Sequence, residues 1–222
     1  MNITIDGGKS KRLLTGGKYC TEDIVVTATS ESRERENSVI RRTVTEYSND
    51  EVPDIGGCIF WGSKVLTSVD FQNVITARES CFRECTALTS VNLPSAKYLY
   101  ANSFRGCTAL TELVFPSVVL IDANAFWDCT SIEKVDLHRA TQLNSGAFGN
   151  NASLKVLIMR DTNAVATLAT VSAFQGTPFA SDGSGSGGTA YVHESLLEDY
   201  RKATNWSALN CTFVKLEGSE YE

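Results

Sequence analysis

The chain has 222 residues, of which 42% are hydrophobic and 21% are charged, and its formal net charge at pH 7 is −6. This length allows one or two domains with a sizeable core, and the composition is ordinary for a globular protein. Phosphate backbones and anionic lipid headgroups attract basic surfaces, so the acidic balance argues against nucleic acid and membrane surfaces as partners. No apolar run reaches the roughly 20 residues of a membrane helix. Residues 1–17 also lack the apolar core of a signal peptide, which favours a chain made in the cytoplasm or a mature fragment.

The N-terminal part predicts a small module followed by a linker. Residues 1–29 contain the dipeptide Gly16–Gly17, typical of a turn, and then an alternating segment at 24–28, typical of a strand. We therefore expect a β-rich module there. Residues 30–38, SESRERENS, are charged and have no hydrophobic pattern, which predicts a solvated linker.

A period of 22 residues organises the segment from 39 to 180, and five columns of this repeat stay apolar through five turns. One column is Phe60, Phe82, Phe104, Phe126 and Phe148, and the column 17 residues further on is Ala77, Leu99, Ile121, Leu143 and Val165. Apolar positions nine and eleven residues after each phenylalanine are two apart, which is the strand period, so each turn predicts a short strand such as 90–93 or 134–137. Stacked turns place these strands in parallel and bury one another, which predicts a solenoid. The last turn is four residues longer, because Phe174 takes the place expected at position 170.

Three of the seven cysteines share one column, three residues after each phenylalanine. Cys85, Cys107 and Cys129 stand there, and Ser63 and Asn151 take the same place in the outer turns. A column that accepts serine and asparagine predicts a small buried residue near a tight turn. A zinc site needs clustered ligands with tetrahedral reach, which one thiol per turn does not supply. The odd number and sparse spacing of the cysteines favour free thiols in a reducing compartment.

Residues 181–222 predict a Gly/Ser loop and a terminal cap. The expected elements are a flexible run, a strand, a helix and a last strand, at 181–188, 189–192, about 194–203 and near 212–216. Leu196, Leu197 and Tyr200 form the apolar face of the helix. The last turn of a solenoid exposes apolar side chains and a strand edge, and such a helix covers both. Trp206 is expected to pack into this cover.

No catalytic set is visible in the sequence. His138 occupies a turn position where other repeats carry proline, which indicates a surface residue, and His193 or Ser195 is expected to cap the helix. Carboxylates recur on the strands, and paired acids support glycoside hydrolysis, but here they lie on neighbouring turns of a flat sheet rather than in a cleft. A carbohydrate-active enzyme is therefore the least favoured function, and no cofactor or metal is expected.

Residues 81–104, CFRECTALTSVNLPSAKYLYANSF, resemble the BspA-type leucine-rich repeat, whose pattern is roughly F-x-x-C-x-x-L-x-x-V-x-L-P-x-x-x-x-I-x-x-x-A/S-F. The match runs from about residue 60 to 159. Residues 11–29, KRLLTGGKYCTEDIVVTAT, resemble a short module of structural proteins in phages and prophages of gut Firmicutes. Residues 190–209, AYVHESLLEDYRKATNWSAL, resemble the cap of phage-encoded repeat proteins, except that His193 stands where proline is usual.

These resemblances imply an α/β leucine-rich-repeat solenoid of mostly short parallel strands, with a small β module at the N-terminus and a helical cap at the C-terminus. They imply a non-enzymatic binding or structural protein of a phage or prophage tail, attached to other virion proteins through residues 1–29. It would be found in the virion, or in the host cytoplasm before assembly. The alternative within the same repeat family is an adhesin on the bacterial cell surface.

Strand residues that alternate with the inward ones point outward together and form the open face with which solenoids bind partners, here a protein or a cell-surface glycan. The alternative is a merely solvated face. The candidate partner-binding residues are Asp70, Asn92, Glu112, Val114, Lys134, Asp136 and Ile158. Trp61 and Trp127 follow the column phenylalanine in their turns, and either stack on sugars or lie against the next turn.

Overall fold

The computed structural model describes residues 2–5, 9–12, 42, 44–50, 52–161 and 163–222. Near the N-terminus, β1 (Asn2–Ile5) pairs antiparallel with β2 (Lys9–Arg12). The predicted glycine turn, the strand at 24–28 and the linker at 30–38 lie outside the described residues. The module expected at residues 1–29 is thus described only as this strand pair, and its standing as a separate unit stays a prediction.

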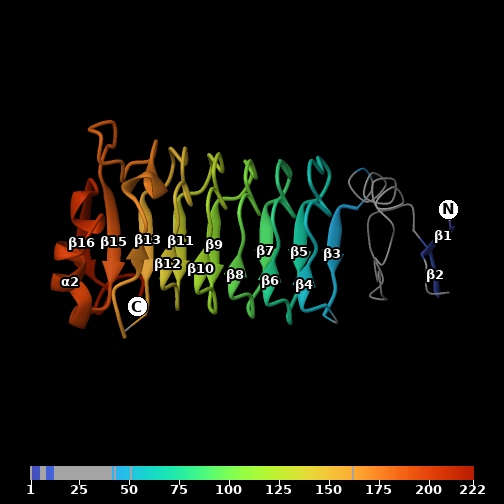
Figure 1. The fold of residues 1–222 in the computed structure, drawn as a ribbon, viewed down its shortest axis with the longest axis horizontal. Coiled ribbons are helices and arrows are strands. Elements are labelled where there is room, and N and C mark those ends of the chain that lie inside the picture. Colours follow the sequence, from blue (N-terminus) through green and yellow to red (C-terminus); the bar gives the residue numbers. More distant parts are fainter. Residues whose placement is uncertain (1, 6–8, 13–41, 43, 51, 162) are drawn as a thin grey trace.

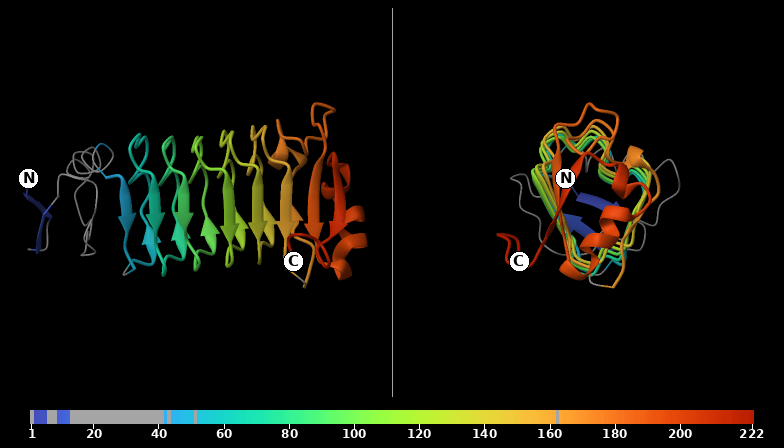
Figure 2. Two further views of the ribbon diagram at one scale, coloured as in Figure 1. Left: turned by 180° about the vertical axis from the view of Figure 1, so that it is seen from behind. Right: turned by 90° about the vertical axis from the view of Figure 1, so that its left-hand side faces the viewer.

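From residue 44 the chain winds into a solenoid whose turns stack along one axis, and the end-on view superimposes them (Figures 1 and 2). One side, the first face, carries β3 (Glu46–Ser48), β5 (Ser68–Asp70), β7 (Ser90–Asn92), β9 (Glu112–Phe115), β11 (Lys134–Leu137), β13 (Val156–Met159), β15 (Gly188–Val192) and β16 (Cys211–Lys215). Another side, the second face, carries β4 (Asp54–Ile55), β6 (Thr76–Ala77), β8 (Tyr98–Leu99), β10 (Leu120–Ile121), β12 (Gln142–Leu143) and β14 (Thr167–Leu168). All these strands pair in parallel, in sheets of three and five strands on the first face and of six on the second.

The register confirms the 22-residue repeat. Val69 lies opposite Val91 on the first face, and Leu113 lies opposite Val135. Along β9 the side chains alternate exposed and buried, as expected for a sheet with one face on the core. The sequence reasoning predicted these strands but missed those of the second face, whose two residues are too few to show a period.

The lengthened turn corrects one column. The predicted fifth member was Val165, but Leu143 pairs with Leu168, which is 3% exposed. The extra residues therefore fall mostly before β14 rather than after it. The prediction that Phe174 resumes the phenylalanine column is confirmed, because its ring lies 5.6 Å from that of Phe148.

The phenylalanine column forms a continuous stack in the core. Centroids of successive rings are 5.2, 5.0, 5.1, 5.5 and 5.6 Å apart from Phe60 to Phe174, with interplanar angles of 19° or less. These rings are 0–2% exposed. The spacing matches the distance between parallel strands, so the backbone pitch brings each ring into contact with the next.

The phenylalanine turns from Phe60 to Phe148 are each bracketed by two residues with positive φ, two positions before and two after the ring, and the turn of Phe174 has only the second. The first column is Cys58, Ser80, Asn102, Asn124 and Gly146, and the second is Gly62, Glu84, Gly106, Asp128, Asn150 and Gly176. Left-handed backbone favours glycine, asparagine and aspartate, which explains why these types dominate both columns. The conformation of the phenylalanine turns thus depends on local backbone preference as well as on packing in the core.

The predicted cap is present, but its helical part is small. It consists of a 3-10 turn, η2 (Glu194–Leu196), the helix α2 (Leu197–Lys202) and a second 3-10 turn, η3 (Trp206–Ala208). The remaining 3-10 turn, η1 (Val171–Phe174), belongs to the last phenylalanine turn. Within the described part of residues 44–180 the regular elements are strands and this one short turn. The fold is therefore a parallel β-solenoid with a small cap, and the α/β class overstated its helical content.

Side chains of the cap bond to the free edge of β14. Tyr200 Oη accepts a hydrogen bond from Ala166 N at 3.2 Å, and Trp206 Nε1 donates to Ala166 O at 2.6 Å. Asn205 Nδ2 donates to Leu168 O at 2.7 Å. These bonds take the place of bonds that another turn would supply to this edge of the second-face sheet. None of the described helices is long and apolar enough to cross a membrane.

Candidate functional site

The N-terminal part of the predicted binding row is exposed on the first face. Asp70, Asn92, Glu112 and Val114 all present their side chains to solvent, and Val114 is 45% exposed. Asn92 Nδ2 donates to Asp70 Oδ1 at 2.9 Å across neighbouring strands. Here the structure brings the predicted residues together as an ordered outer row.

Lys134 links this row to the next turn. Its Nζ lies 2.6 Å from Glu112 Oε1, and this hydrogen bond raises the pKa of Lys134. Side chains that are already paired have less rotamer freedom to lose when a partner binds. The part of the predicted site that solvent reaches, named the outer row below, consists of the exposed Asp70, Asn92, Glu112 and Val114 and the partly exposed Lys134.

Two predicted site residues are covered. Asp136 is 7% exposed and Ile158 is 1% exposed, although both point to the outer side of the sheet. Arg160 binds the Asp136 carboxylate through Nε and Nη2, each at 2.8 Å, and Nη2 also donates to the backbone oxygen of Tyr221 at 2.7 Å. The C-terminal segment therefore crosses the outside of the first face, where the end-on view shows it beside the solenoid (Figure 2).

The ring of Tyr221 shows which strands the segment crosses. Its centroid is 4.8 Å from that of Tyr191 and 5.5 Å from Lys134 Nζ. Ile158 lies opposite Tyr191 in the strand register, on the strand between the two contacts of Tyr221, and Asp136 lies opposite Ile158 on the strand of Lys134. The prediction that they form part of an open face is corrected, because a contact across 61 residues of sequence covers them.

The cysteine column is a packing feature, as predicted. Cys85, Cys107 and Cys129 are fully buried, and each thiol donates to the carbonyl oxygen of the phenylalanine in the preceding turn at 3.0–3.1 Å. Asn151 Nδ2 makes the same bond to Phe126 O at 3.0 Å. Burial raises the pKa of Cys129 to about 12, so its thiol is neutral and unreactive near pH 7. The six cysteines in the described part of the chain are free thiols, and no cluster of metal ligands occurs there.

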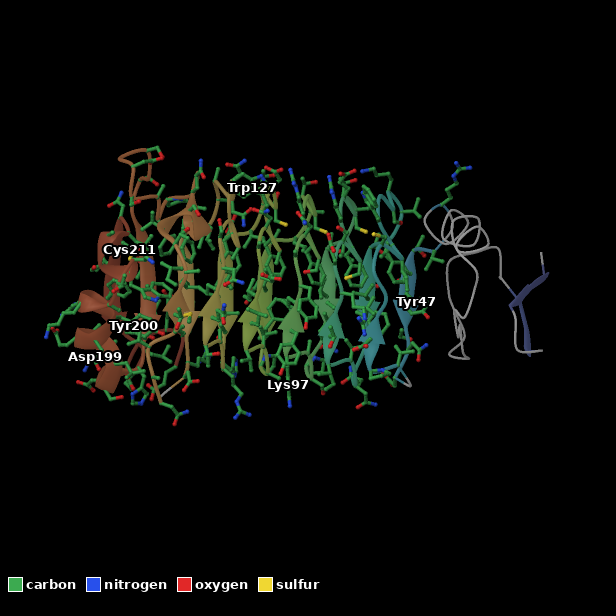
Figure 3. All side chains as sticks on the ribbon, viewed as in Figure 1. Tyr47, Lys97, Trp127, Asp199, Tyr200 and Cys211 are labelled. Carbon is green, nitrogen blue, oxygen red and sulfur yellow. The ribbon has the colours of Figure 1, made fainter. Side chains whose placement is uncertain are left out.

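The two tryptophans differ. Trp61 is 38% exposed, with the guanidinium of Arg83 4.9 Å from the ring centroid. Trp127 lies at the edge of the turns (Figure 3) and packs against the next turn, since a Cβ added to Gly149 would lie 2.1 Å from its ring. Of the two alternatives, stacking on sugars and packing against the next turn, the second holds for Trp127.

Ser195, His193 and Glu217 lie together in the cap. His193 Nδ1 accepts from Ser195 N at 3.2 Å and is 2.7 Å from Ser195 Oγ, while Nε2 is 2.9 Å from Glu217 Oε1. Glu217 also accepts twice from Glu194 N, and backbone N–H groups lower its pKa. The arrangement satisfies the first N–H groups of the helix, as His193 was expected to do. His138 is partly exposed, 3.6 Å from Asp136.

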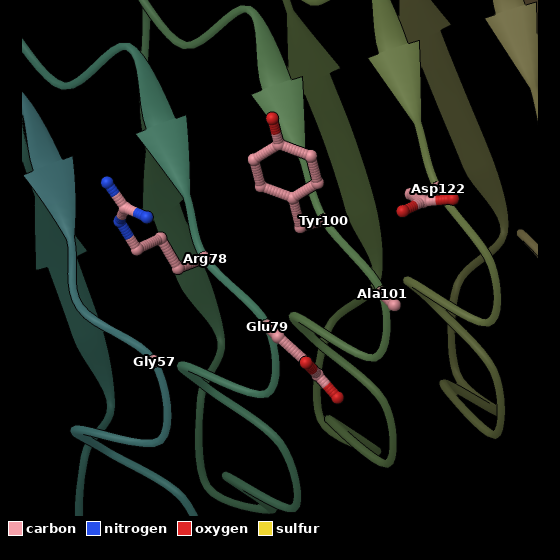
Figure 4. Close-up of a pocket in the computed structure, with 6 residues that line it drawn as sticks. All are labelled: Gly57, Arg78, Glu79, Tyr100, Ala101 and Asp122. Carbon is pink, nitrogen blue, oxygen red and sulfur yellow. The ribbon is translucent and has the colours of Figure 1, made fainter.

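The second face has a shallow hollow that the sequence reasoning did not single out. Its volume is about 330 Å³. The residues that line it are Gly57, Arg78, Glu79, Tyr100, Ala101 and Asp122, on successive turns (Figure 4). The reasoning from sequence considered outward residues only on the first face, so this side was missed.

Comparison with known proteins decides the family. The sequence pattern described as BspA type leucine rich repeat region matches in six copies over residues 43–155, just over half of the chain. The chain belongs to the BspA-type leucine-rich-repeat family. The family prediction is thus confirmed.

One solved structure that resembles this BspA-type chain is the crystal structure of the pneumococcal vaccine antigen PcpA. The TM-score is 0.58 and the sequence identity is 14%, over 82% of this chain and 44% of that one. The chain therefore matches less than half the length of PcpA, and the likeness concerns the fold. A search of curated proteins gave no match.

Proposed function

We propose that this BspA-type chain is a non-enzymatic binding protein that recognises a protein or a surface glycan through the outer row. The observation that carries the proposal is the outer row itself: Asp70, Asn92 and Val114 lie exposed at one repeat position on consecutive turns, above a buried core, and Glu112 lies exposed two residues before Val114 on the same strand. Solenoids use such extended surfaces for binding. The family match and the likeness to the fold of PcpA support repeat-mediated binding.

The chemistry of the outer row indicates the type of partner. Asp70 and Glu112 are acidic, and their carboxylates accept hydrogen bonds but donate none. Val114 adds an exposed apolar side chain in the same strand as Glu112. A partner with hydrogen-bond donors or basic groups around a small apolar contact complements this surface, whereas the phosphates of nucleic acids are repelled.

The test is binding of the labelled chain to intact Gram-positive gut bacteria. We expect saturable binding, and at least a tenfold weaker apparent affinity for the double variant Asp70→Lys/Glu112→Lys. Charge changes at exposed sites alter stability by only about 0.5 kcal/mol, so the variant should fold. The control is Asp182→Lys/Asp199→Lys, which makes the same change in net charge at exposed sites away from the outer row. Equal loss in both variants, or no binding to any strain, would contradict the proposal.

We further propose that the chain is tail-associated in a phage or prophage. The support is the resemblance of residues 11–29 and 190–209 to phage-borne modules; in this role residues 1–29 attach the chain to other virion proteins. A lysogenic culture of the source bacterium, induced and separated into phage particles, cell wall and cytosol, gives the test with antibodies against the purified chain. Enrichment in the particles is the expected result. Enrichment in the cell wall would instead identify an adhesin.

A further inference from the structure

Two tyrosines stand out from the second face. Tyr98 and Tyr100 lie two residues apart at and after β8, so both point outward, while Leu99 between them is fully buried. They are 38% and 39% exposed, and their ring centroids are 6.4 Å apart with an interplanar angle of 19°. Together they present a stacked aromatic surface to solvent beside the hollow on this face.

The fold does not require tyrosine at either position. In neighbouring turns, the column of Tyr98 holds Thr76, Leu120 and Gln142, and the column of Tyr100 holds Arg78, Asp122 and Asn144. Columns this varied place no packing demand on the side chain. Within the described part of the chain, neither tyrosine hydroxyl has a hydrogen-bond partner. The two rings therefore need an explanation other than stability, and exposed aromatic surface is typical of binding sites.

Polar groups flank Tyr100 on both adjacent turns (Figure 4). Asp122 Oδ1 accepts hydrogen bonds from its neighbour Ala123 N and from Asn144 Nδ2, each at 2.7 Å, which fixes the carboxylate. On the other side, Arg78 pairs with Asp54 at 2.5 Å while its side chain stays 56% exposed. Asp122 keeps acceptor capacity on its second oxygen, and the guanidinium keeps free N–H groups.

We infer that the hollow between Arg78 and Asp122, with Tyr100 beside it and Tyr98 next to Tyr100, is a binding subsite for a neutral hexopyranose of a glycan. A pyranose has one apolar C–H face, which suits a tyrosine ring, and a rim of hydroxyls, which suits a fixed carboxylate and a guanidinium. A volume of about 330 Å³ is at the small end for ligand sites and fits one or two sugar units. Glu79 and Asp122 outweigh Arg78 in charge, so acidic sugars are disfavoured.

This subsite lies on the second face and is independent of the outer row, so it extends the proposed function to a second contact surface. The inference of a sugar subsite can be wrong while the outer row still binds its partner, and variants of the two surfaces distinguish these cases. If Tyr98→Gln/Tyr100→Asn leaves binding to bacteria intact while Asp70→Lys/Glu112→Lys abolishes it, the outer row stands and the sugar subsite is not part of recognition.

The direct test is saturation-transfer NMR of the full chain with soluble di- to tetrasaccharides of glucose, galactose, mannose and N-acetylglucosamine. At least one series is expected to receive saturation at its C–H protons and to bind with a measurable dissociation constant. The double variant Tyr98→Gln/Tyr100→Asn takes the residues that Gln142 and Asn144 supply two turns later, so its fold should be kept. It is expected to bind at least tenfold more weakly.

The control is Trp61→Ala, which removes an equally exposed aromatic ring that does not line the hollow and should leave oligosaccharide binding unchanged. Two results would overturn the inference. One is the absence of saturation transfer from every oligosaccharide, and the other is equal affinity of the parent and the double tyrosine variant.

Discussion

Replacement of Phe104 by alanine is expected to lower the free energy of unfolding by about 3–5 kcal/mol. Phe104 is 0% exposed and lies in the middle of the ring stack, 5.0 Å from Phe82 and 5.1 Å from Phe126. The substitution leaves a cavity between two turns whose backbones are tied by parallel hydrogen bonds, so the gap cannot close by a local shift. Urea unfolding followed by circular dichroism measures the change.

Phe104→Leu is the matched control, because it keeps most of the volume and removes the ring contacts. We expect it to cost about 1 kcal/mol, in line with the energy of aromatic pairs beyond their burial. In a solenoid each turn is stabilised mainly by its neighbours. The alanine variant should therefore also broaden the urea unfolding transition, because the turns before and after Phe104 then unfold less cooperatively. A loss below about 1 kcal/mol for Phe104→Ala would show that the stack contributes little.

The parts of the fold that could be predicted are those in which the same positions of every turn are buried. Each turn buries a phenylalanine and two strand residues against the same neighbours, so the 22-residue period is visible in the side chains alone. The cap was predictable for a related reason, since the apolar spacing of Leu196 and Tyr200 indicates a helix face. In these places local sequence and tertiary burial point to the same answer.

The strands of the second face were missed because their signal is too short. Leu99 and Ile121 appeared as one apolar column, but a single inward residue per turn does not distinguish a strand from a loop. The phenylalanine turns were predictable in principle. Asn102 and Gly106 bracket their ring with types that favour positive φ, and the next two turns repeat this pattern with Asn124 and Asp128 and with Gly146 and Asn150.

The candidate site was predicted only where it depends on strand alternation. Asp70 and Glu112 are exposed because they alternate on their strands with the buried Val69 and Leu113. Asp136 obeys the same alternation, yet it is covered through Arg160 and Tyr221, which lie in other parts of the sequence. A contact between residues so far apart in sequence leaves no local sequence pattern. The point at which the exposed part of the first face ends could therefore be found only from the structure.

Replacement of Trp206 by alanine is expected to destabilise the chain by about 3–5 kcal/mol and to make it associate. Trp206 is 1% exposed and packs on the last ring of the stack, with its centroid 6.1 Å from that of Phe174. It also contacts Tyr200 at 5.2 Å and Phe213 at 6.3 Å. Its loss leaves Ala166 O without the indole donor and opens the side of the last turn.

Association follows from the geometry of a strand edge. The N–H and C=O groups beside β14 are the next hydrogen-bonding positions of a parallel sheet, and the side chains of Tyr200, Asn205 and Trp206 bond to them. Once those side chains withdraw, another copy of the chain can pair there.

Urea unfolding and sedimentation velocity at several concentrations measure the loss of stability and the association. Trp61→Ala is the control, since that ring is 38% exposed and its contact with Arg83 is worth only about 0.5–1 kcal/mol. If Trp206→Ala were monomeric and as stable as this control, the cap would not be what terminates the solenoid.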